Sequence, residues 1–340
     1  MQQANPAVPP APPARKRGRV GCVLLIAALL LAIASGALAV HLWSGTGPAK
    51  ADTTVIVPVG ASLNRAADAL EKAGTVRSAR MFVLFSKILG SGEPIKAGEY
   101  RFKAGESQSN ILTLMQSGRT LQRMVTITPG MPSILAYEAL MKADHLTGDA
   151  AIPAEGSLLP DSYAYNRGDT RQSVLDRMQK AMRDYLAAAW ARRSPGIAVT
   201  TPEQAVILAS IIEKETGKPS ERRLVAGVYS NRLKRGMKLQ ADPTIIYPIT
   251  RGKPLGRRIL RSEIDAVNDY NTYSMVGLPK GPIANPSRES IDAALNPERT
   301  NSVYFVADGT GGHVFADTLD QHNANVAKWR DIRRARGEIQ

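Results

Sequence analysis

Two carboxylates near the end of one apolar helix are the residues of this chain best suited to acid–base chemistry. The helix expected over residues 201–216 has an apolar stripe made of Ala205, Leu208, Ile211 and Ile212. At about 100° per residue, Glu215 falls close to the centre of that stripe, whereas Glu213 falls near its polar flank. Burial raises the pKa of a carboxyl group, so Glu215 is the better candidate for a general acid.

A surface charge is the simpler interpretation of Glu215. Glutamate side chains usually reach solvent or pair with a basic residue. Four basic residues are close in the sequence: Lys214, Lys218, Arg222 and Arg223. Periodicity alone therefore leaves both interpretations open.

Both ends of this helix are marked by residues that start or stop helices. Thr201 is expected to cap the N-terminus, with Pro202 in the first turn and Gln204 completing a capping box. Gly217 and Pro219 are expected to end the helix. The sequence therefore places Glu215 in the last helical turn.

Polar loops follow the next expected helix, which covers residues 221–235. They carry amide, hydroxyl and aromatic side chains at high density, in segments 239–244, 268–273 and 277–283. Turn formation by Asn, Gly and Pro explains each segment separately but explains their density less well. Gln240, Asn271 and Tyr273 are candidates for positioning a sugar or stabilising charge. Asp242 and Glu213 are the candidates for a second carboxylate, which an ordinary glycosidase would need.

Composition excludes several classes of protein. The chain of 340 residues has one cysteine, Cys22, and four scattered histidines, so neither an internal disulfide nor a thiolate metal cage is possible. We find no zinc-protease, serine-hydrolase or P-loop motif and expect neither a metal nor a cofactor. The net charge of +14 favours an anionic partner, such as nucleic acid, lipid headgroups or an acidic cell-wall polymer. A solvated basic surface would also account for it.

An apolar run near the N-terminus predicts a membrane anchor. Residues 20–40 carry no charge and span about 30 Å as a helix, which is enough to cross a bilayer. A cleavable signal peptide is the alternative, because Ala37, Leu38 and Ala39 resemble a cleavage site, but its apolar core would be shorter. The basic residues before the run keep the N-terminus in the cytoplasm. We therefore expect a single-pass protein of the inner (plasma) membrane with its bulk outside the cytoplasm.

The expected fold class is α+β, with the N-terminal transmembrane helix followed by a small α+β module and a larger α+β domain. The expected divisions are a basic tail at 1–19, the anchor at 20–42, a linker at 43–52, the module at 53–122 and the large domain at 123–340. In the module, residues 53–59 and 95–102 predict strands, and three segments predict helices: 61–72, 78–89 and 109–116. In the large domain, residues 302–307 and 312–316 predict a hairpin.

Several motifs, in order along the chain, resemble the endolytic murein transglycosylases of the YceG-like family. They are LASIIEKET at 208–216, NRL at 231–233, LQADPT at 239–244, YNTY at 270–273, GLP with GPI at 277–283, and YFVADG with GGH at 304–313. The resemblance runs from about residue 53 to the end. Departures are Ser157, Leu158 and Leu159 where the family is aromatic, Lys280 where proline is common, and a divergent basic stretch at 248–262.

The resemblance implies a LysM-like module and a YceG-like catalytic domain. It also implies cleavage of the MurNAc–GlcNAc β-1,4 bond of nascent glycan strands, with formation of 1,6-anhydro ends, and Glu215 as the catalytic residue. Substrate binding is expected from Glu155, Glu213, Asn231, Gln240, Asp242, Thr244, Tyr270, Asn271, Thr272 and Tyr273. Peptidoglycan strands, and possible peptidoglycan synthases, are the expected partners.

A non-catalytic, peptidoglycan-binding scaffold for cell-wall synthesis enzymes is the alternative function, since the basic surface and a LysM-like module fit it. A nucleic-acid binder is disfavoured by the anchor and by the scarcity of aromatic residues.

Overall fold

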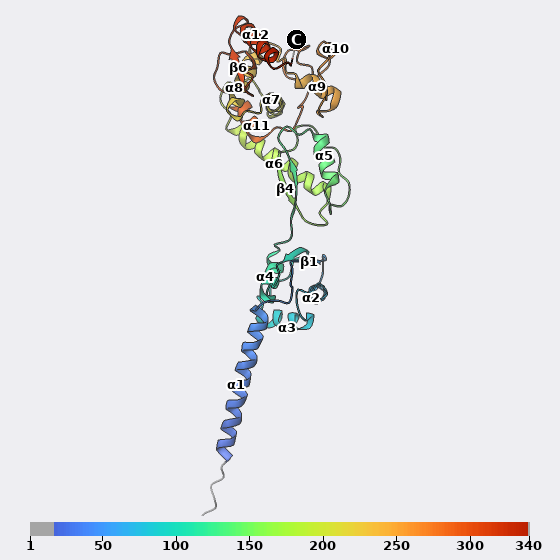
Figure 1. Cartoon of the computed structure of the whole chain (residues 1–340), viewed down its shortest axis with the longest axis vertical. Coiled ribbons are helices and arrows are strands. Elements are labelled where there is room, and N and C mark those ends of the chain that lie inside the picture. Colours follow the sequence, from blue (N-terminus) through green and yellow to red (C-terminus); the bar gives the residue numbers. More distant parts are fainter. Residues whose placement is uncertain (1–16, 339–340) are drawn as a thin grey trace, which may run out of the picture. The chain divides into compact units, whose positions relative to one another are not determined.

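The computed structural model describes residues 17–338, with side chains from residue 22 onward, and the chain separates into two compact units (Figure 1). The first unit ends at Leu121 and the second begins at Gln122. Residues 1–16 of the expected basic tail lie outside the described residues. The described part is α+β, and its strands form three antiparallel pairs.

The first unit contains one long helix and a small α+β body. Its elements are α1 (Arg17–Ser44), β1 (Thr53–Val57), α2 (Leu63–Lys72), α3 (Ala79–Leu89), β2 (Gly98–Phe102) and α4 (Gln108–Ser117). Serine side chains cap α2, α3 and α4 by accepting a hydrogen bond from the third residue beyond each cap. β1 ends two residues earlier than expected, because Pro58 begins a turn that its carbonyl closes with the N–H of Ala61.

α1 includes the segment Cys22–Ser44, which is long and apolar enough to cross a membrane. The last turn of α1 packs against the small α+β body and is not part of an exposed linker. Trp43 is only 8% exposed and packs against Phe82 and Phe85 of α3, with ring centroids 6.1 and 6.2 Å away. Gln108 of α4 donates a hydrogen bond to the Leu42 carbonyl at 3.0 Å. The end of the apolar helix is therefore part of the core of the small body.

The second unit is mainly helical, with two short antiparallel strand pairs, of which β5–β6 is a hairpin. Its elements are β3 (Arg123–Ile127), α5 (Ser133–Lys142), β4 (Asp161–Tyr165), α6 (Arg171–Ala191), α7 (Pro202–Glu215), α8 (Arg222–Lys234), α9 (Pro243–Thr250), α10 (Arg261–Ile264), α11 (Arg288–Leu295), β5 (Tyr304–Ala307), β6 (His313–Ala316) and α12 (Leu319–Ala335). Helices α9, α10 and α11 were not expected from the sequence.

Helix α7 lies at the centre of this unit and packs against α6, α8 and α11. Most of its apolar side chains are buried, and Ala205, Leu208 and Ile211 are fully buried. Thr201 caps α7 as expected by accepting from the N–H of Gln204. The capping box is not formed as expected, because the Gln204 side chain accepts from the N–H of Thr200 instead. Burial on three sides makes α7 a rigid support for the residues at its end.

Candidate active site

Glu215 is the last residue of α7, and its carboxyl group points into the protein. Its Oε1 atom is buried and has no hydrogen-bond partner among the described residues. Burial, and after it the negative charge of neighbouring Asp242, raise the pKa of Glu215 to about 8. The hydroxyl of Tyr229 and the charge of Arg232 partly oppose this rise. A carboxyl group in such surroundings keeps its proton at neutral pH and can donate it.

Helix α8 supplies two of the groups around Glu215. Tyr229 and Arg232 are three residues apart and therefore share one face of the helix. Tyr229 is 1% exposed and packs edge-on against Phe305 of β5, with centroids 5.8 Å apart. This packing fixes the phenol that lies within hydrogen-bonding reach of Glu215.

The guanidinium of Arg232 is held by the backbone rather than by a carboxylate. It donates to the carbonyls of Val303 at 2.6 Å and Leu239 at 2.7 Å, and to the side-chain oxygen of Gln240 at 3.3 Å. Burial lowers its pKa, as expected for a desolvated cation. A positive charge is thus fixed near Glu215 without neutralising it through a direct ion pair.

Asp242 and Tyr273 complete the surroundings of Glu215. The Tyr273 hydroxyl donates to Asp242 Oδ1 at 2.7 Å. Burial raises the pKa of Tyr273, and its hydrogen bond to Asp242 raises it further, so the phenol stays protonated. We refer to Glu215, Tyr229, Arg232, Asp242 and Tyr273 as the Glu215 cluster.

Hydrogen bonds between two loops position Asp242 and Tyr273. The N–H of Gln240 donates to the Thr272 carbonyl at 3.2 Å, and the N–H of Ala241 donates to the Thr272 hydroxyl at 3.0 Å. The hydroxyls of Thr244 and Thr272 are 2.9 Å apart. Gln240 adopts a left-handed backbone conformation with φ of 54°, which turns the chain between these contacts.

Three of the expected binding residues therefore have partners inside the protein. Thr244 and Thr272 hold the two loops together, and both are fully buried. Asn271 is also fully buried and donates to the carbonyls of Ile264 at 2.9 Å and Ala266 at 2.6 Å. These side chains position the loop that carries Tyr273.

Glu213, Glu155 and Asn231 have hydrogen-bond partners outside the Glu215 cluster. Glu213 Oε2 accepts from the N–H of Ser287 at 2.9 Å and from its hydroxyl at 2.5 Å. Glu155 accepts from the N–H of Ser133 at 2.8 Å, and burial raises its pKa despite that bond. Each of these carboxylates ties two segments of the second unit together.

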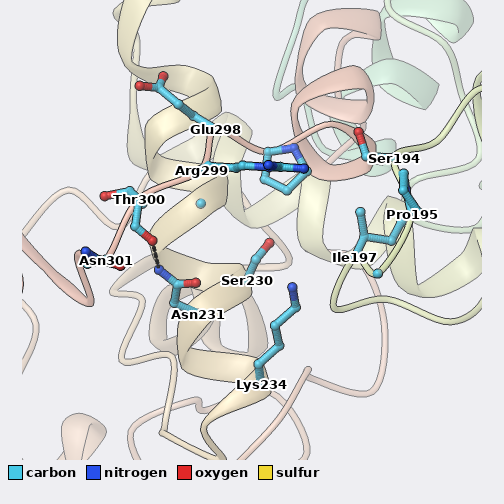
Figure 2. A pocket seen from close by; sticks show the side chains of 13 residues that line it. Ser194, Pro195, Ile197, Ser230, Asn231, Lys234, Glu298, Arg299, Thr300 and Asn301 are labelled. Atoms are coloured by element: carbon cyan, nitrogen blue, oxygen red, sulfur yellow. Dashed lines mark hydrogen bonds between the residues drawn. The ribbon is translucent and has the colours of Figure 1, made fainter.

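Asn231 lies on α8 beside a separate pocket (Figure 2). Its amide donates to the carbonyls of Thr300 at 2.8 Å and Ser302 at 3.0 Å. Arg299 and Lys234 line the same pocket, which has a volume of about 410 Å³. These bonds hold the Asn231 amide against the loop that precedes β5.

Tyr270 packs against Tyr247 of α9, with ring centroids 4.9 Å apart. Tyr247 also lines a pocket of about 440 Å³, together with Lys214 and Pro243. Lys214 and Pro243 are the sequence neighbours of Glu215 and Asp242. This pocket is therefore built on the two segments that carry the carboxylates of the Glu215 cluster.

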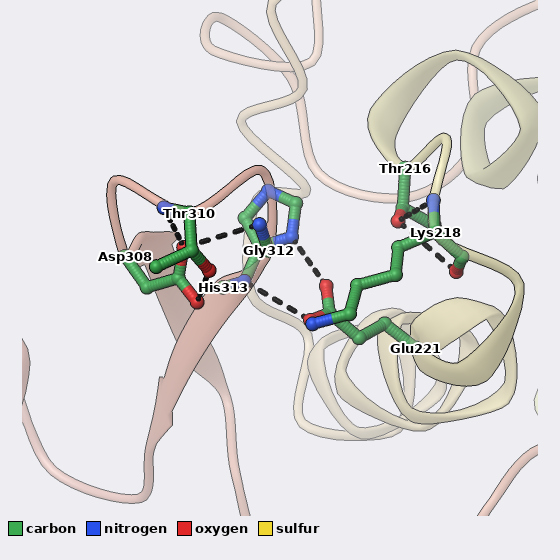
Figure 3. A network of polar contacts seen from close by, with 7 residues as sticks. All are labelled: Thr216, Lys218, Glu221, Asp308, Thr310, Gly312 and His313. Atoms are coloured by element: carbon green, nitrogen blue, oxygen red, sulfur yellow. Dashed lines mark hydrogen bonds and ion pairs between the residues drawn. The ribbon is translucent and has the colours of Figure 1, made fainter.

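A polar network fixes the chain just after Glu215 (Figure 3). Thr216 accepts from the N–H of Lys218 at 3.1 Å, and Lys218 pairs with Glu221 at 3.1 Å. Glu221 also contacts His313 Nδ1 at 2.8 Å, which joins this segment to β6. At Gly312 a Cβ atom would lie 2.4 Å from Glu221 Oε1, so a larger residue there would displace the Glu221 carboxylate. The network holds the end of α7 against the β5–β6 hairpin.

Sequence reasoning missed Tyr229 and Arg232. They lie three residues apart in α8, whose other buried residues are apolar or small, and Arg232 lies within the NRL motif. A buried arginine in such a motif was the available signal. Among the described residues, no group of three or more His, Cys, Asp or Glu side chains is arranged to hold a metal ion.

Comparison with known proteins assigns the chain to a family of cell-wall enzymes. Residues 55–328 match the YceG-like family, and the chain belongs to that family. A relative from Bacillus subtilis (strain 168), named endolytic murein transglycosylase, is 29% identical over 82% of this chain and 85% of its own length. A relative of the same name from Streptococcus pneumoniae (strain D39) is also 29% identical over 82% of this chain, which covers 58% of that longer protein.

A crystal structure of a yceG-like protein from Listeria monocytogenes is similar to this one. It aligns with a TM-score of 0.50 and 25% identity, covering 81% of this chain and 99% of that chain. The resemblance expected from the motifs is therefore confirmed. The expected enzyme class, lytic transglycosylase, is confirmed by the name that the relatives carry.

Proposed function

We propose that this chain cleaves the MurNAc–GlcNAc β-1,4 bond of peptidoglycan glycan strands and leaves 1,6-anhydro-MurNAc ends. The observation that carries the proposal is the buried carboxyl group of Glu215, whose pKa of about 8 keeps it protonated at neutral pH. The names of the relatives support murein as the substrate.

In the first step, protonated Glu215 donates its proton to the glycosidic oxygen, and the bond from that oxygen to the anomeric carbon breaks. In the second step, the resulting carboxylate takes the proton of the MurNAc 6-hydroxyl while that oxygen attacks the anomeric carbon. The proton lost by Glu215 is thereby restored, and no water is consumed. A single residue serves as acid and then as base.

The surroundings of Glu215 suit both steps. A pKa near the working pH balances proton donation against proton acceptance. Asp242 disfavours ionisation of Glu215 before the reaction, while Tyr229 and Arg232 stabilise the anion once the proton has left. Asp242 itself is hydrogen-bonded to Tyr273, and we propose that it acts through its charge on Glu215 and on the developing oxocarbenium ion.

The decisive experiment compares the full-length protein with its Glu215→Gln variant on purified sacculi, with products identified by mass spectrometry. The glutamine can neither donate nor accept the proton, so release of anhydro-muropeptides should fall by at least about 1,000-fold. Glu213→Gln is the matched control, because it makes the same change two residues away.

Each outcome of this digest has one meaning. Anhydro products lost only in the Glu215 variant support the proposal, whereas loss only in the Glu213 variant would move the acid to Glu213. Hydrated reducing ends from the unaltered protein would make it a hydrolase. Binding to sacculi without any product would favour the scaffold function.

We also propose that the first unit is a LysM-like module on an uncleaved anchor. The strand–helix–helix–strand order of β1, α2, α3 and β2, with the two strands paired antiparallel, supports the module. Retention of α1 is supported by its course, because it runs as one helix through Ala37, Leu38 and Ala39 and packs Ala39 against the same core as Trp43. The protein would then lie in the inner membrane with both units outside the cytoplasm, near peptidoglycan strands and their synthases.

A further inference from the structure

The outer face of α3 is apolar, unlike that of its neighbouring helices. Met81, Leu84 and Ile88 are 41, 46 and 66% exposed. At about 100° per residue these three side chains fall within an arc of roughly 60° on one face of the helix. Leu89, at the end of α3, is also 41% exposed.

Neighbouring helix α2 shows what an ordinary outer face looks like in this unit. Its exposed positions are polar or charged and include Arg65, Asp68 and Glu71. The two helices have similar lengths and pack against each other. The exposed apolar row of α3 is therefore a local feature and not a general property of the small body.

Contacts with α1 determine where this row lies. Trp43, near the end of α1, packs against Phe82 and Phe85 of α3, and Phe85 is next to Met81 around the helix circumference. The exposed row thus begins at the edge of α3 that contacts the end of α1. The apolar surface of α1 continues into the apolar surface of α3.

The length of α1 sets the depth of α3. From Cys22 to Leu42 an α-helix rises about 30 Å, which is the thickness of the hydrocarbon core of a bilayer. Trp43 then falls at the level of the headgroups, where tryptophan is enriched in membrane proteins. Because Trp43 packs on α3, α3 falls at the same level.

Two basic residues lie along one side of the apolar row. Arg80 and Lys87 lie next to each other around α3, on the side away from α1, and both are exposed. Neither makes an ion pair among the described residues. A helix with an apolar face bordered by basic residues can lie in a membrane interface and attract anionic lipids.

We propose that α3 lies in the outer interface of the bilayer that α1 crosses, with Met81, Leu84 and Ile88 among the acyl chains and Arg80 and Lys87 at the headgroups. This inference rests on the proposed membrane anchor. The small unit is then attached to the membrane by both α1 and α3. Two attached helices fix its orientation on the membrane surface, whereas α1 alone would let it rotate.

The test places a fluorescent probe on single cysteines in the full-length protein, reconstituted in nanodiscs of phosphatidylcholine and phosphatidylglycerol. Cys22→Ala removes the only native cysteine. Ile88→Cys then places an environment-sensitive dye on the apolar row, Asp68→Cys places it on α2 as a matched exposed control, and Leu30→Cys places it inside α1. Lipids with a nitroxide on the acyl chain quench any dye that is buried among them.

We expect blue-shifted emission and nitroxide quenching at positions 30 and 88, and neither at position 68. Quenching at 30 without quenching at 88 would overturn the placement of α3 while keeping the anchor. Absence of quenching at 30 would overturn the anchor and the inference that rests on it. A blue shift at 88 without quenching would mean that a protein surface, not lipid, covers the row.

Discussion

The two glutamates at the end of α7 are two residues apart and lie in opposite kinds of surroundings. Glu213 Oε2 receives two hydrogen bonds from Ser287, the N-cap of α11, where the helix dipole favours a negative charge. Glu215 Oε1 is buried without a partner among the described residues, and its pKa is raised to about 8. A helix turns about 200° over two residues, which separates the two side chains onto different faces.

The two carboxylates therefore differ in burial and in hydrogen bonding, and this difference is the basis for proposing Glu215, and not Glu213, as the general acid. Two hydrogen bonds from Ser287 satisfy one carboxylate oxygen of Glu213. Burial, together with the charge of Asp242, stabilises the neutral form of Glu215. If this contrast is correct, substitutions at the two positions should affect different measurements.

The largest effect on stability should come from Glu215→Gln, which should flatten the dependence of the unfolding free energy on pH. The carboxyl group has an ordinary pKa of 4.5 and a folded-state pKa of about 8, so it binds a proton more tightly when folded. Its stabilising contribution is therefore complete below 4.5 and is lost as the pH rises through about 8. The loss is on the order of a few kcal/mol.

Denaturant titrations across that pH window measure this effect. The unaltered protein should lose stability with rising pH more steeply than the Glu215→Gln variant. Parallel curves for the two proteins would mean that the pKa of Glu215 is near its ordinary value, and the contrast with Glu213 would disappear.

A smaller effect is expected from Asp242→Asn, which removes the negative charge next to Glu215. The pKa of Glu215 should fall, because Asp242 is one of the causes that raise it. Since the acid must be protonated, the alkaline limb of the pH–rate profile should move to lower pH, and the rate should drop roughly 10-fold. Asp269→Asn is the control, because Asp269 pairs with Lys280 on the surface at 2.9 Å. Equal profiles for both variants would remove Asp242 from the site.

The sequence predicted the part of the site that depends on local geometry. Helical phase placed Glu215 on the buried face of α7, and the Thr201 cap was found as expected. Tyr229 and Arg232 were missed because their approach to Glu215 depends on how α8 packs against α7. The partners of Asn271 and Thr272 include backbone groups of other turns, and such pairings cannot be predicted from a sequence pattern.

Some elements of the fold could not be predicted from the sequence pattern either. α9 contains Pro248 in its interior, a residue that normally argues against a helix. Trp43 was expected in a linker, but it belongs to α1 and to the core of the small body. Its partners Phe82 and Phe85 are about 40 residues away in the chain, so only the folded structure joins them.

The smallest effect should come from Glu213→Gln, and it should appear in stability rather than in catalysis. Glutamine keeps an oxygen that can accept from Ser287 but loses the charge, which should cost about 1 kcal/mol of unfolding free energy. Glu203→Gln on the exposed first turn of α7 is the control and should change stability by less than about 0.5 kcal/mol. The alkaline limb of the pH–rate profile should stay at the same pH in both variants. If Glu213→Gln moved that limb as Asp242→Asn is expected to, the two glutamates would share one titration, and the division between a structural and a catalytic carboxylate would be wrong.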